Sequence, residues 1–313
     1  MSIKSIAVDS GKYDTKALLK GVKGEDDKKI RFRTKMDDTM EEIASDRRSC
    51  VFNYEGRRVM IGDSAETVDY DKTKAKDIHK MSTYAAIAQL VDDGDEVLLT
   101  IGCPISIFNN VEERKQYKEY MHDKGELEVV LNAKRKRFTI NDVIVCPESS
   151  GVIWKHANRF KDKLIGVVDI GGLNTNCCIY DRLSPVRSTS FTTNLGANIL
   201  RNELKQHLNS AFAEANLQDW QMEHIIKDGR IKSHPEESKI LIKDFLQRHI
   251  NAVIDECKRK GWDIDNIDFI FVGGGSKLLE NEIKNVIADA EISETAEWDN
   301  VEGFAIIGGL KNE

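Results

Sequence analysis

Residues 167–181 read VVDIGGLNTNCCIYD, and the rest of the chain is organised around them. An apolar run enters a short Asp-x-Gly-Gly turn and a second apolar run leaves it, which predicts two strands joined by a tight hairpin. Glycines in the turn let the backbone take positive φ or lie close to a ligand. Backbone N–H groups of such a loop can bind an anion, and the carboxylate of Asp169 suits the oxygen shell of Mg²⁺. The stretch therefore indicates a site for phosphate and metal.

The same pattern occurs near the N-terminus, where residues 8–19 read VDSGKYDTKALL. Two copies of one hairpin, half a chain apart, predict two similar domains that face each other across a cleft. A phosphate chain in that cleft would be held from both sides. In an alignment without gaps, the matching pairs are Val8 and Val168, Asp9 and Asp169, Gly11 and Gly171, Asp14 and Asn174, and Thr15 and Thr175.

The composition is that of an ordinary globular protein. The chain has 313 residues, of which 40% are hydrophobic and 32% charged, with four prolines. At about 100–200 residues per domain, this length predicts two domains. The net charge of -7 argues against direct contact with nucleic acid or anionic membrane, because such surfaces need clustered lysine and arginine. Any link to DNA is therefore expected to be indirect.

The sequence also predicts a cytoplasmic protein. No stretch approaches the roughly 18 apolar residues of a membrane span, and the N-terminus enters a predicted strand without a signal-peptide core. The six cysteines show neither C-x-x-C spacing nor a histidine at metal-site distance. We interpret them as small apolar residues rather than as redox or zinc ligands.

Alternating strand and helix signals predict an α/β fold. Residues 82–91 are alanine-rich with apolar residues at helical spacing, and the apolar strand 96–102 follows after a short turn. Leucines recur every four residues over 200–208, and residues 238–260 form a long amphipathic pattern. This order of strand, helix and strand is typical of the α/β class. Further predicted elements are strands over 49–54, 58–61, 126–131, 138–145 and 188–193, and helices over 109–124, 277–288 and 299–309.

Two stretches have a functional and a structural interpretation. Residues 134–137 read KRKR and suit a phosphate backbone, although a solvated hairpin turn is the interpretation that we favour. Residues 273–276 read GGGS between a predicted strand and helix, which fits a phosphate or ribose at a helix N-terminus and a structural tight turn equally well. They match neither a dinucleotide fingerprint nor a Walker A loop.

Glu148 and Lys16 are the side chains with the clearest chemistry outside the turns. Glu148 follows Pro147 at the end of a predicted strand, where a carboxylate can orient water for attack on a phosphoryl group. A helix cap or a surface acid is the structural alternative. Lys16 can neutralise a phosphate or lie exposed on a strand. The seven histidines form no constellation and receive no role.

Five stretches in order resemble the motifs of the actin, Hsp70 and sugar-kinase superfamily. Residues 8–16, 145–151, 167–175, 271–276 and 300–309 correspond to its phosphate-1, connect-1, phosphate-2, adenosine and connect-2 motifs. Within the superfamily the chain is most similar to bacterial actin-like proteins of the ParM type, which segregate plasmids. The resemblance implies two actin-like (ribonuclease H-like) domains that flank a nucleotide cleft, each with a smaller peripheral subdomain. The implied boundaries are 1–160 with 297–313, carrying a subdomain at about 30–80, and 161–296, carrying one at about 205–260.

The resemblance also implies the roles of individual residues in an ATPase with Mg²⁺. Glu148 and Asp169 would be catalytic, with Glu148 positioning the attacking water, and Asp9 and Asp169 would hold the metal through water. One sequence departure is Leu173, where relatives often carry a threonine. The nucleotide would be bound by Ser10, Gly11, Lys12, Lys16, Gly171, Gly172, Leu173, Asn174, Gly196, Asn202, Lys205, Gly273, Gly274, Gly275, Ser276 and Lys277.

Two functions are consistent with these motifs. The first is a filament-forming ATPase that uses ATP, with GTP as an alternative, and segregates plasmid DNA through an adaptor bound to a plasmid centromere. The second is a sugar or small-metabolite kinase of the same superfamily that does not polymerise. We favour the filament, because such kinases carry an aspartate base soon after connect-1, and residues 149–151 read SSG. A chaperone-like role has less support.

Overall fold

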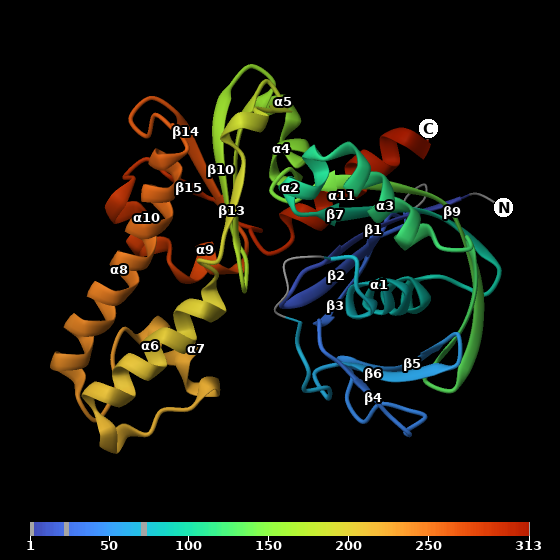
Figure 1. Ribbon diagram of the computed structural model, residues 1–313, viewed down its shortest axis with the longest axis horizontal. Coiled ribbons are helices and arrows are strands. Elements are labelled where there is room, and N and C mark those ends of the chain that lie inside the picture. Colours follow the sequence, from blue (N-terminus) through green and yellow to red (C-terminus); the bar gives the residue numbers. More distant parts are fainter. Residues whose placement is uncertain (1–2, 22–24, 70–73, 313) are drawn as a thin grey trace. The chain divides into compact units, whose positions relative to one another are not determined.

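The computed structural model describes residues 3–21, 25–69 and 74–312. The chain divides into two compact units (Figure 1): unit 1 comprises residues 1–157 with 298–313, and unit 2 comprises residues 158–297. Each unit is built on its own β-sheet with helices packed against it. Among the described residues, no helix has the length and apolar character needed to cross a membrane.

Unit 1 contains one sheet of nine strands in the order β3-β2-β1-β7-β9-β8-β5-β6-β4. Strand β1 lies antiparallel to β2 and parallel to β7, and β7 lies parallel to β9. This order brings the end of β1 beside the ends of β7 and β9. The strands are β1 Lys4–Ser10, β2 Asp14–Leu19, β3 Lys28–Arg33, β4 Met36–Asp38, β5 Ser49–Tyr54, β6 Arg57–Gly62, β7 Asp95–Cys103, β8 Glu126–Leu131 and β9 Lys134–Pro147.

Helices cover both faces of this sheet. The sheet curls around α1 (Asp77–Leu90), so that strands from both halves of the sheet pack against this helix (Figure 1). Eleven of the fourteen residues of α1 are buried, which explains why its sequence is rich in alanine and apolar on most sides. On the other face, Val301, Phe304 and Ala305 of α11 (Asp299–Asn312) pack on β1 and β7. The remaining helices here are α2 Ile105–Asn109, α3 Val111–His122, α4 Gly151–Lys155 and α5 Ala157–Phe160, which continues into unit 2.

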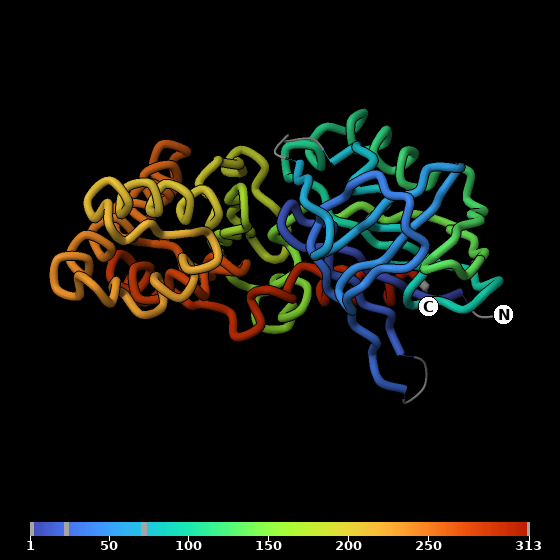
Figure 2. The backbone as a smooth tube through the Cα atoms, turned by 90° about the horizontal axis from the view of Figure 1, so that it is seen from below, coloured from blue at the N-terminus to red at the C-terminus, as the bar shows by residue number. Residues whose placement is uncertain are grey.

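Unit 2 repeats the central part of this topology. Its strands run in the order β12-β11-β10-β14-β15, and β13 also pairs with β11. Helices α6 and α8 pack on the sheet through apolar stripes that include Leu204 and Ile250, and their coils lie in the yellow-to-orange part of Figure 2. The elements are β10 Leu164–Ile170, β11 Thr175–Asp181, β12 Ser184–Pro185, β13 Phe191–Thr193, β14 Asp268–Val272, β15 Glu291–Ile292, α6 Ala197–Ala211, α7 Asp219–Asp228, α8 Pro235–Arg259, α9 Gly274–Leu278 and α10 Glu280–Val286.

The duplicated hairpin predicted from the sequence is present with the same register in both units. Asp9 lies opposite Lys16 in the β1–β2 pair, and Asp169 lies opposite Asn176 in the β10–β11 pair. Strand β10 lies parallel to β14 as β1 lies parallel to β7. The two aspartates therefore occupy equivalent positions in equivalent sheets.

The prediction that residues 134–137 form the hairpin turn is wrong. The turn consists of Asn132 and Ala133, at φ of 46° and 63°, and the basic run belongs to β9. Lys136 donates hydrogen bonds to the carbonyls of Ala88 and Val91, both at 2.6 Å. This lysine therefore binds carbonyls at the C-terminal end of α1, where a cation is favoured.

Two elements of unit 2 are shorter than predicted. Residues 187–189 form a single 3₁₀ turn before β13, because the Thr189 hydroxyl donates to the Val186 carbonyl and accepts from the Ile179 N–H. The predicted helix 277–288 is divided into α9 and α10 at the fully buried Leu279, whose ψ of 18° departs from helical values. All six cysteines are buried, which agrees with their interpretation as small apolar residues.

Candidate functional site

In unit 1, two predicted carboxylates share one buried ammonium group. Asp9, near the end of β1, is 8% exposed, and Glu148, directly after β9, is 6% exposed. The ammonium of Lys74 forms an ion pair with Glu148 Oε1 and lies 3.9 Å from Asp9 Oδ1. Glu148 is thus neither a helix cap nor a surface acid. Burial alone would lower the pKa of Lys74, but the carboxylates of Glu148 and Asp9 raise it above its usual value.

The backbone around Glu148 is fixed by neighbouring elements. Its N–H donates to the Cys103 carbonyl at the end of β7, at 2.8 Å. The next residue, Ser149, is at a φ of 74°, and its N–H donates to Asn300 Oδ1 of α11. The Ser150 hydroxyl donates to the Pro147 carbonyl at 2.7 Å. Strand end, turn and helix together hold the Glu148 carboxylate beside Asp9.

The Asp9 turn also contacts a histidine at the start of α1. The Ser10 hydroxyl lies 3.1 Å from His79 Nδ1, and both side chains are buried. Burial lowers the pKa of His79 to about 3, and the nearby ammonium groups of Lys74 and Lys12 act in the same direction. His79 is therefore neutral near pH 7, so it adds no positive charge to the site.

The remaining predicted residues of the first hairpin lie around its turn. A Cβ on Gly11 would lie 2.8 Å from the Asp14 carbonyl, so the tight turn excludes a side chain at this position. The buried Asp14 carboxylate is paired with Arg31 and Arg33 of β3. Lys12 in the turn and Lys16 on β2 are half-buried. The turn is therefore held by β3 and carries two lysines near its tip.

In unit 2, Asp169 lies against a glycine at the end of β14. A Cβ on Gly273 would lie 2.4 Å from Asp169 Oδ1 and 2.5 Å from the Ile170 carbonyl. Gly273 is also at a φ of 83°, which disfavours a side chain. Asp169 is 6% exposed. The predicted phosphate-2 and adenosine motifs are therefore in contact at these two residues.

The Asp169 turn docks onto the start of α6. The N–H groups of Ala197 and Asn198 donate to the carbonyls of Gly171 and Gly172, at 2.9 and 2.7 Å. A Cβ on Gly196 would lie 2.5 Å or less from the backbone of Leu173 and Asn174, so only glycine permits this approach. The structure thus brings Gly171, Gly172, Leu173, Asn174 and Gly196 together.

The contact with α6 fixes the directions in which the backbone C=O and N–H groups of the Asp169 turn point. In a trans peptide the N–H points opposite to the C=O of the same unit. Because the carbonyls of Gly171 and Gly172 point at α6, the N–H groups of Gly172 and Leu173 point away from it. Leu173 as a whole is buried, with 9% of its surface exposed. Successive N–H groups of this kind form a concave site for an anion.

The other predicted nucleotide residues of unit 2 are less clearly grouped. Ser276 is fully buried and its hydroxyl donates to the Val272 carbonyl at 2.5 Å, while Gly275 packs on Ile170. Gly274 and Lys277 are exposed on α9, which has only five residues and therefore a small helix dipole. On α6, Asn202 is exposed and Lys205 pairs with Asp219 of α7. The structure therefore does not group these residues as closely as it groups those of the Asp169 turn.

The donor set fits hydrated Mg²⁺. Among residues 3–21, 25–69 and 74–312, no three His, Cys, Asp or Glu side chains form a group that could hold a metal ion. Carboxylates occur instead as the pair Asp9 and Glu148 in unit 1 and as Asp169 in unit 2. Mg²⁺ typically keeps several waters and binds one or two carboxylates together with substrate phosphates. The residues present suit that mode rather than a metal site made by protein alone.

Sequence reasoning missed Lys74 and His79. Lys74 precedes α1 and His79 lies in its first turn, in a polar stretch without strong periodicity. Nothing in the local sequence marks either residue as part of a site. Their contacts with Asp9, Ser10 and Glu148 arise only when α1 packs inside the curled sheet. The one usable signal is that Lys74 and His79 flank the start of a helix that contains the apolar run 84–88.

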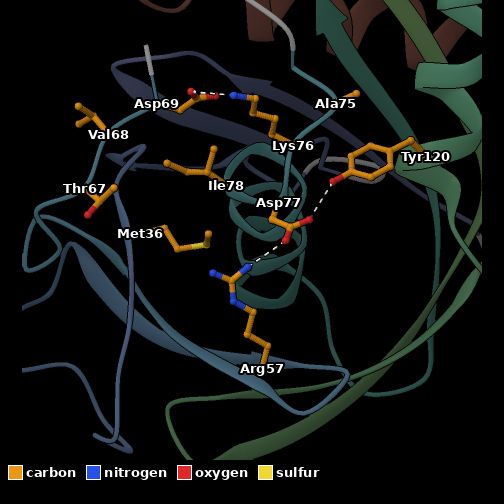
Figure 3. Close-up of a pocket in the computed structure, with 10 residues that line it drawn as sticks. All are labelled: Met36, Arg57, Thr67, Val68, Asp69, Ala75, Lys76, Asp77, Ile78 and Tyr120. Atoms are coloured by element: carbon orange, nitrogen blue, oxygen red, sulfur yellow. Dashed lines mark hydrogen bonds and ion pairs between the residues drawn. The ribbon is translucent and has the colours of Figure 1, made fainter. Parts of the chain in front are cut away.

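A cavity of about 620 Å³ lies elsewhere in unit 1 (Figure 3). Its charged groups are paired with each other: Arg57 Nη1 lies 2.9 Å from Asp77 Oδ2, and Lys76 Nζ lies 3.2 Å from Asp69 Oδ1. The Tyr120 hydroxyl donates to Asp77 Oδ1. None of the residues predicted from the sequence lines this cavity. It is lined by Met36, Arg57, Thr67, Val68, Asp69, Ala75, Lys76, Asp77, Ile78 and Tyr120.

The chain is similar to actin homologues. Residues 7–151 match the family model described as the N-terminal domain of actin-like proteins. A search of curated proteins finds no significant match. Among solved structures, an Alp12 filament is 25% identical, with 99% of both chains covered and a TM-score of 0.74.

Two further structures share the fold at lower identity. The archaeal actin homologue Ta0583 in complex with ADP is 20% identical, covering 98% of this chain and 100% of that one with a TM-score of 0.76. A 15-stranded ParM filament from Clostridium botulinum is 16% identical, covering 99% and 100% with a TM-score of 0.77. The superfamily resemblance and the α/β fold predicted from the sequence are confirmed. Residues 7–151 thus match the N-terminal domain of the actin-like proteins, and the chain has, over nearly its whole length, the two-domain fold of the actin homologues.

Proposed function

We propose that the protein is a Mg²⁺-dependent ATPase whose nucleotide state controls its assembly into filaments. One observation carries the proposal: two units of actin-like fold each place a buried aspartate at the same register position of the same hairpin. Each turn would contribute to nucleotide binding through its aspartate and its backbone N–H groups. The ADP complex of Ta0583 and the Alp12 and ParM filaments support nucleotide binding and self-assembly for this fold.

The residues of each unit suit different tasks in hydrolysis. The N–H groups of Gly172 and Leu173 would bind phosphate oxygens, and Lys12 and Lys16 would balance phosphate charge. The Glu148 carboxylate would orient the attacking water and accept its proton. When bound, Mg²⁺ supplies positive charge that stabilises the phosphoryl oxygens. Asp9 and Asp169 would hold its water ligands.

The site favours water over a substrate hydroxyl as the nucleophile. Ser149 and Ser150, which follow Glu148, are almost fully buried, and residue 151 is glycine. No aspartate stands here to act as the base of a sugar kinase. Hydrolysis rather than transfer to a small molecule is the reaction that this arrangement supports.

The biological role that we propose is plasmid segregation in the cytoplasm. The net charge of -7 is unfavourable for direct DNA binding, so the filament would reach a plasmid centromere through a DNA-binding adaptor. ATP is the expected nucleotide, with GTP as the alternative.

Light scattering and sedimentation with Mg²⁺ and ATP, ADP or GTP test the proposal. We expect scattering to rise on addition of ATP, to rise less with ADP, and to be accompanied by phosphate release. A protein that stays monomeric with ATP at high concentration, yet phosphorylates a sugar or small metabolite, would contradict the filament assignment.

A further inference from the structure

Lys74 is the least expected component of the site. Its side chain is 2% exposed, although a lysine is almost never fully buried without a charged partner. Both carboxylates near its ammonium belong to residues that we assign to metal and water positioning, Asp9 and Glu148. Taking an ammonium out of water is unfavourable unless such partners compensate for it. The burial of Lys74 therefore depends on these two carboxylates.

The Lys74 ammonium is the cation that the structure places beside both Asp9 and Glu148. His79 also borders Asp9 through Ser10, but its pKa of about 3 keeps it neutral near pH 7. The Lys74 ammonium forms an ion pair with Glu148 Oε1 and lies 3.9 Å from Asp9 Oδ1. One ammonium facing two carboxylates gives the three groups a net negative charge. A divalent cation would satisfy the same oxygens with one more unit of charge.

We propose that Lys74 is an internal counter-ion of Asp9 and Glu148 that competes with the divalent metal for Asp9. Without metal, its ammonium holds the two carboxylates together and lowers their mutual repulsion. Metal binding near Asp9 then requires the ammonium to withdraw, because two cations cannot occupy one carboxylate pair without strong repulsion. Lys74 thereby weakens metal binding in the absence of nucleotide. The inference rests on the proposed function only for the identity of the metal site.

Removing the Lys74 charge should strengthen metal binding in the absence of nucleotide. The probe is Mn²⁺, whose free concentration is measured by electron paramagnetic resonance on the nucleotide-free protein. We expect Lys74→Met to bind Mn²⁺ at least about tenfold more tightly than the wild type, since a like charge next to the metal is lost. Lys74→Arg, which keeps the charge, should bind Mn²⁺ as weakly as the wild type.

Lys4→Met is the matched control. Lys4 also bridges two carboxylates, those of Asp92 and Asp95 at 3.1 and 2.5 Å, but it lies at the other end of β1. This control should leave the Mn²⁺ affinity unchanged. A gain of equal size in Lys4→Met would show a general charge effect and overturn the proposal.

A double variant keeps the test informative if Lys74→Met unfolds. Lys74→Met with Glu148→Gln removes one charge of each sign, so it avoids an uncompensated buried carboxylate at Glu148. Its Mn²⁺ affinity should lie below that of Lys74→Met and should fall further with Asp9→Asn. Folded Lys74→Met with wild-type Mn²⁺ affinity, or a double variant insensitive to Asp9→Asn, would overturn the counter-ion role. Because no nucleotide is present, these results are independent of whether the wild type hydrolyses ATP or assembles.

Discussion

The Asp9 turn and the Asp169 turn are two copies of one hairpin in different surroundings. Each places an aspartate at the same register position beside a parallel strand. The first aspartate lies among ionisable side chains, with Lys74 and Glu148 within reach. The second lies against backbone, next to Gly273 and a turn that docks on α6. The two hairpins thus share one backbone geometry, while the neighbouring elements surround the two aspartates with different chemical groups.

This difference predicts a division of labour between the units. Side chains that can move protons or exchange partners are concentrated in unit 1, where changes should affect turnover and metal binding. Unit 2 contributes closely packed backbone at the Asp169 turn, where changes should affect stability and binding together. Substitutions chosen from each turn can separate the two roles.

The largest effect is expected from Glu148→Gln. If Glu148 orients and deprotonates water, phosphate release should fall by ~10²–10⁴-fold while ATP binding and ATP-dependent assembly persist. A phosphate-release assay beside light scattering measures both properties. Glu96→Gln is the control, because Glu96 is an exposed acid at the opposite end of β7 that accepts a surface hydrogen bond from Asn141. Native turnover in Glu148→Gln would remove Glu148 from the mechanism.

A backbone effect is expected from Gly273→Ala. The added Cβ would meet Asp169 Oδ1 at 2.4 Å at a φ of 83°, so overpacking and strain should lower the free energy of unfolding by about 2–3 kcal/mol. Its neighbour provides the control: a Cβ on Gly274 has its nearest contact at 3.6 Å, and its φ is not positive. Gly274→Ala should change stability by less than about 0.5 kcal/mol. Urea unfolding measures the free energy of unfolding of both variants. Equal losses in the two would contradict the tight packing of Gly273 against Asp169.

Local features of this molecule were predictable from the sequence, and contacts made by packing were not. The hairpins at Asp9 and Asp169 follow from apolar runs and glycine turns within about fifteen residues. The paired strands, the leucine stripe of α6 and the end of α8 near Gly261 are equally local.

The failures have physical reasons. The turn before β9 uses Ala133 at positive φ, a conformation that alanine rarely adopts and that no composition rule would select. Lys74 becomes part of the site only because α1 lies inside the curled sheet. The roles of Asn202 and Lys205 stay predictions, because they depend on a bound nucleotide. A buried lysine opposite two carboxylates is thus visible only in three dimensions.

The smallest of the three effects concerns pH and tests the ionic character of unit 1. The folded-state pKa of His79 is about 3, below the unfolded value of about 6.5, so the unfolded chain binds more protons between these values. Stability from this group is therefore complete above about pH 6.5 and is lost as the pH falls toward 3. At pH 5 the loss amounts to about 2 kcal/mol.

Thermal melts of the wild type and of His79→Gln at pH 7.5 and pH 5 measure this contribution. His79→Gln should lose less stability on acidification, because glutamine has no proton to take up in the unfolded state. His249 in unit 2 also has a pKa lowered by burial, so His249→Gln shows how much of the acid sensitivity belongs to the other unit. Since His79 is more deeply buried and faces Lys74 and Lys12, we expect the larger share from His79. If His79→Gln loses as much thermal stability between pH 7.5 and pH 5 as the wild type, the acid sensitivity does not come from the histidine beside the Asp9 turn.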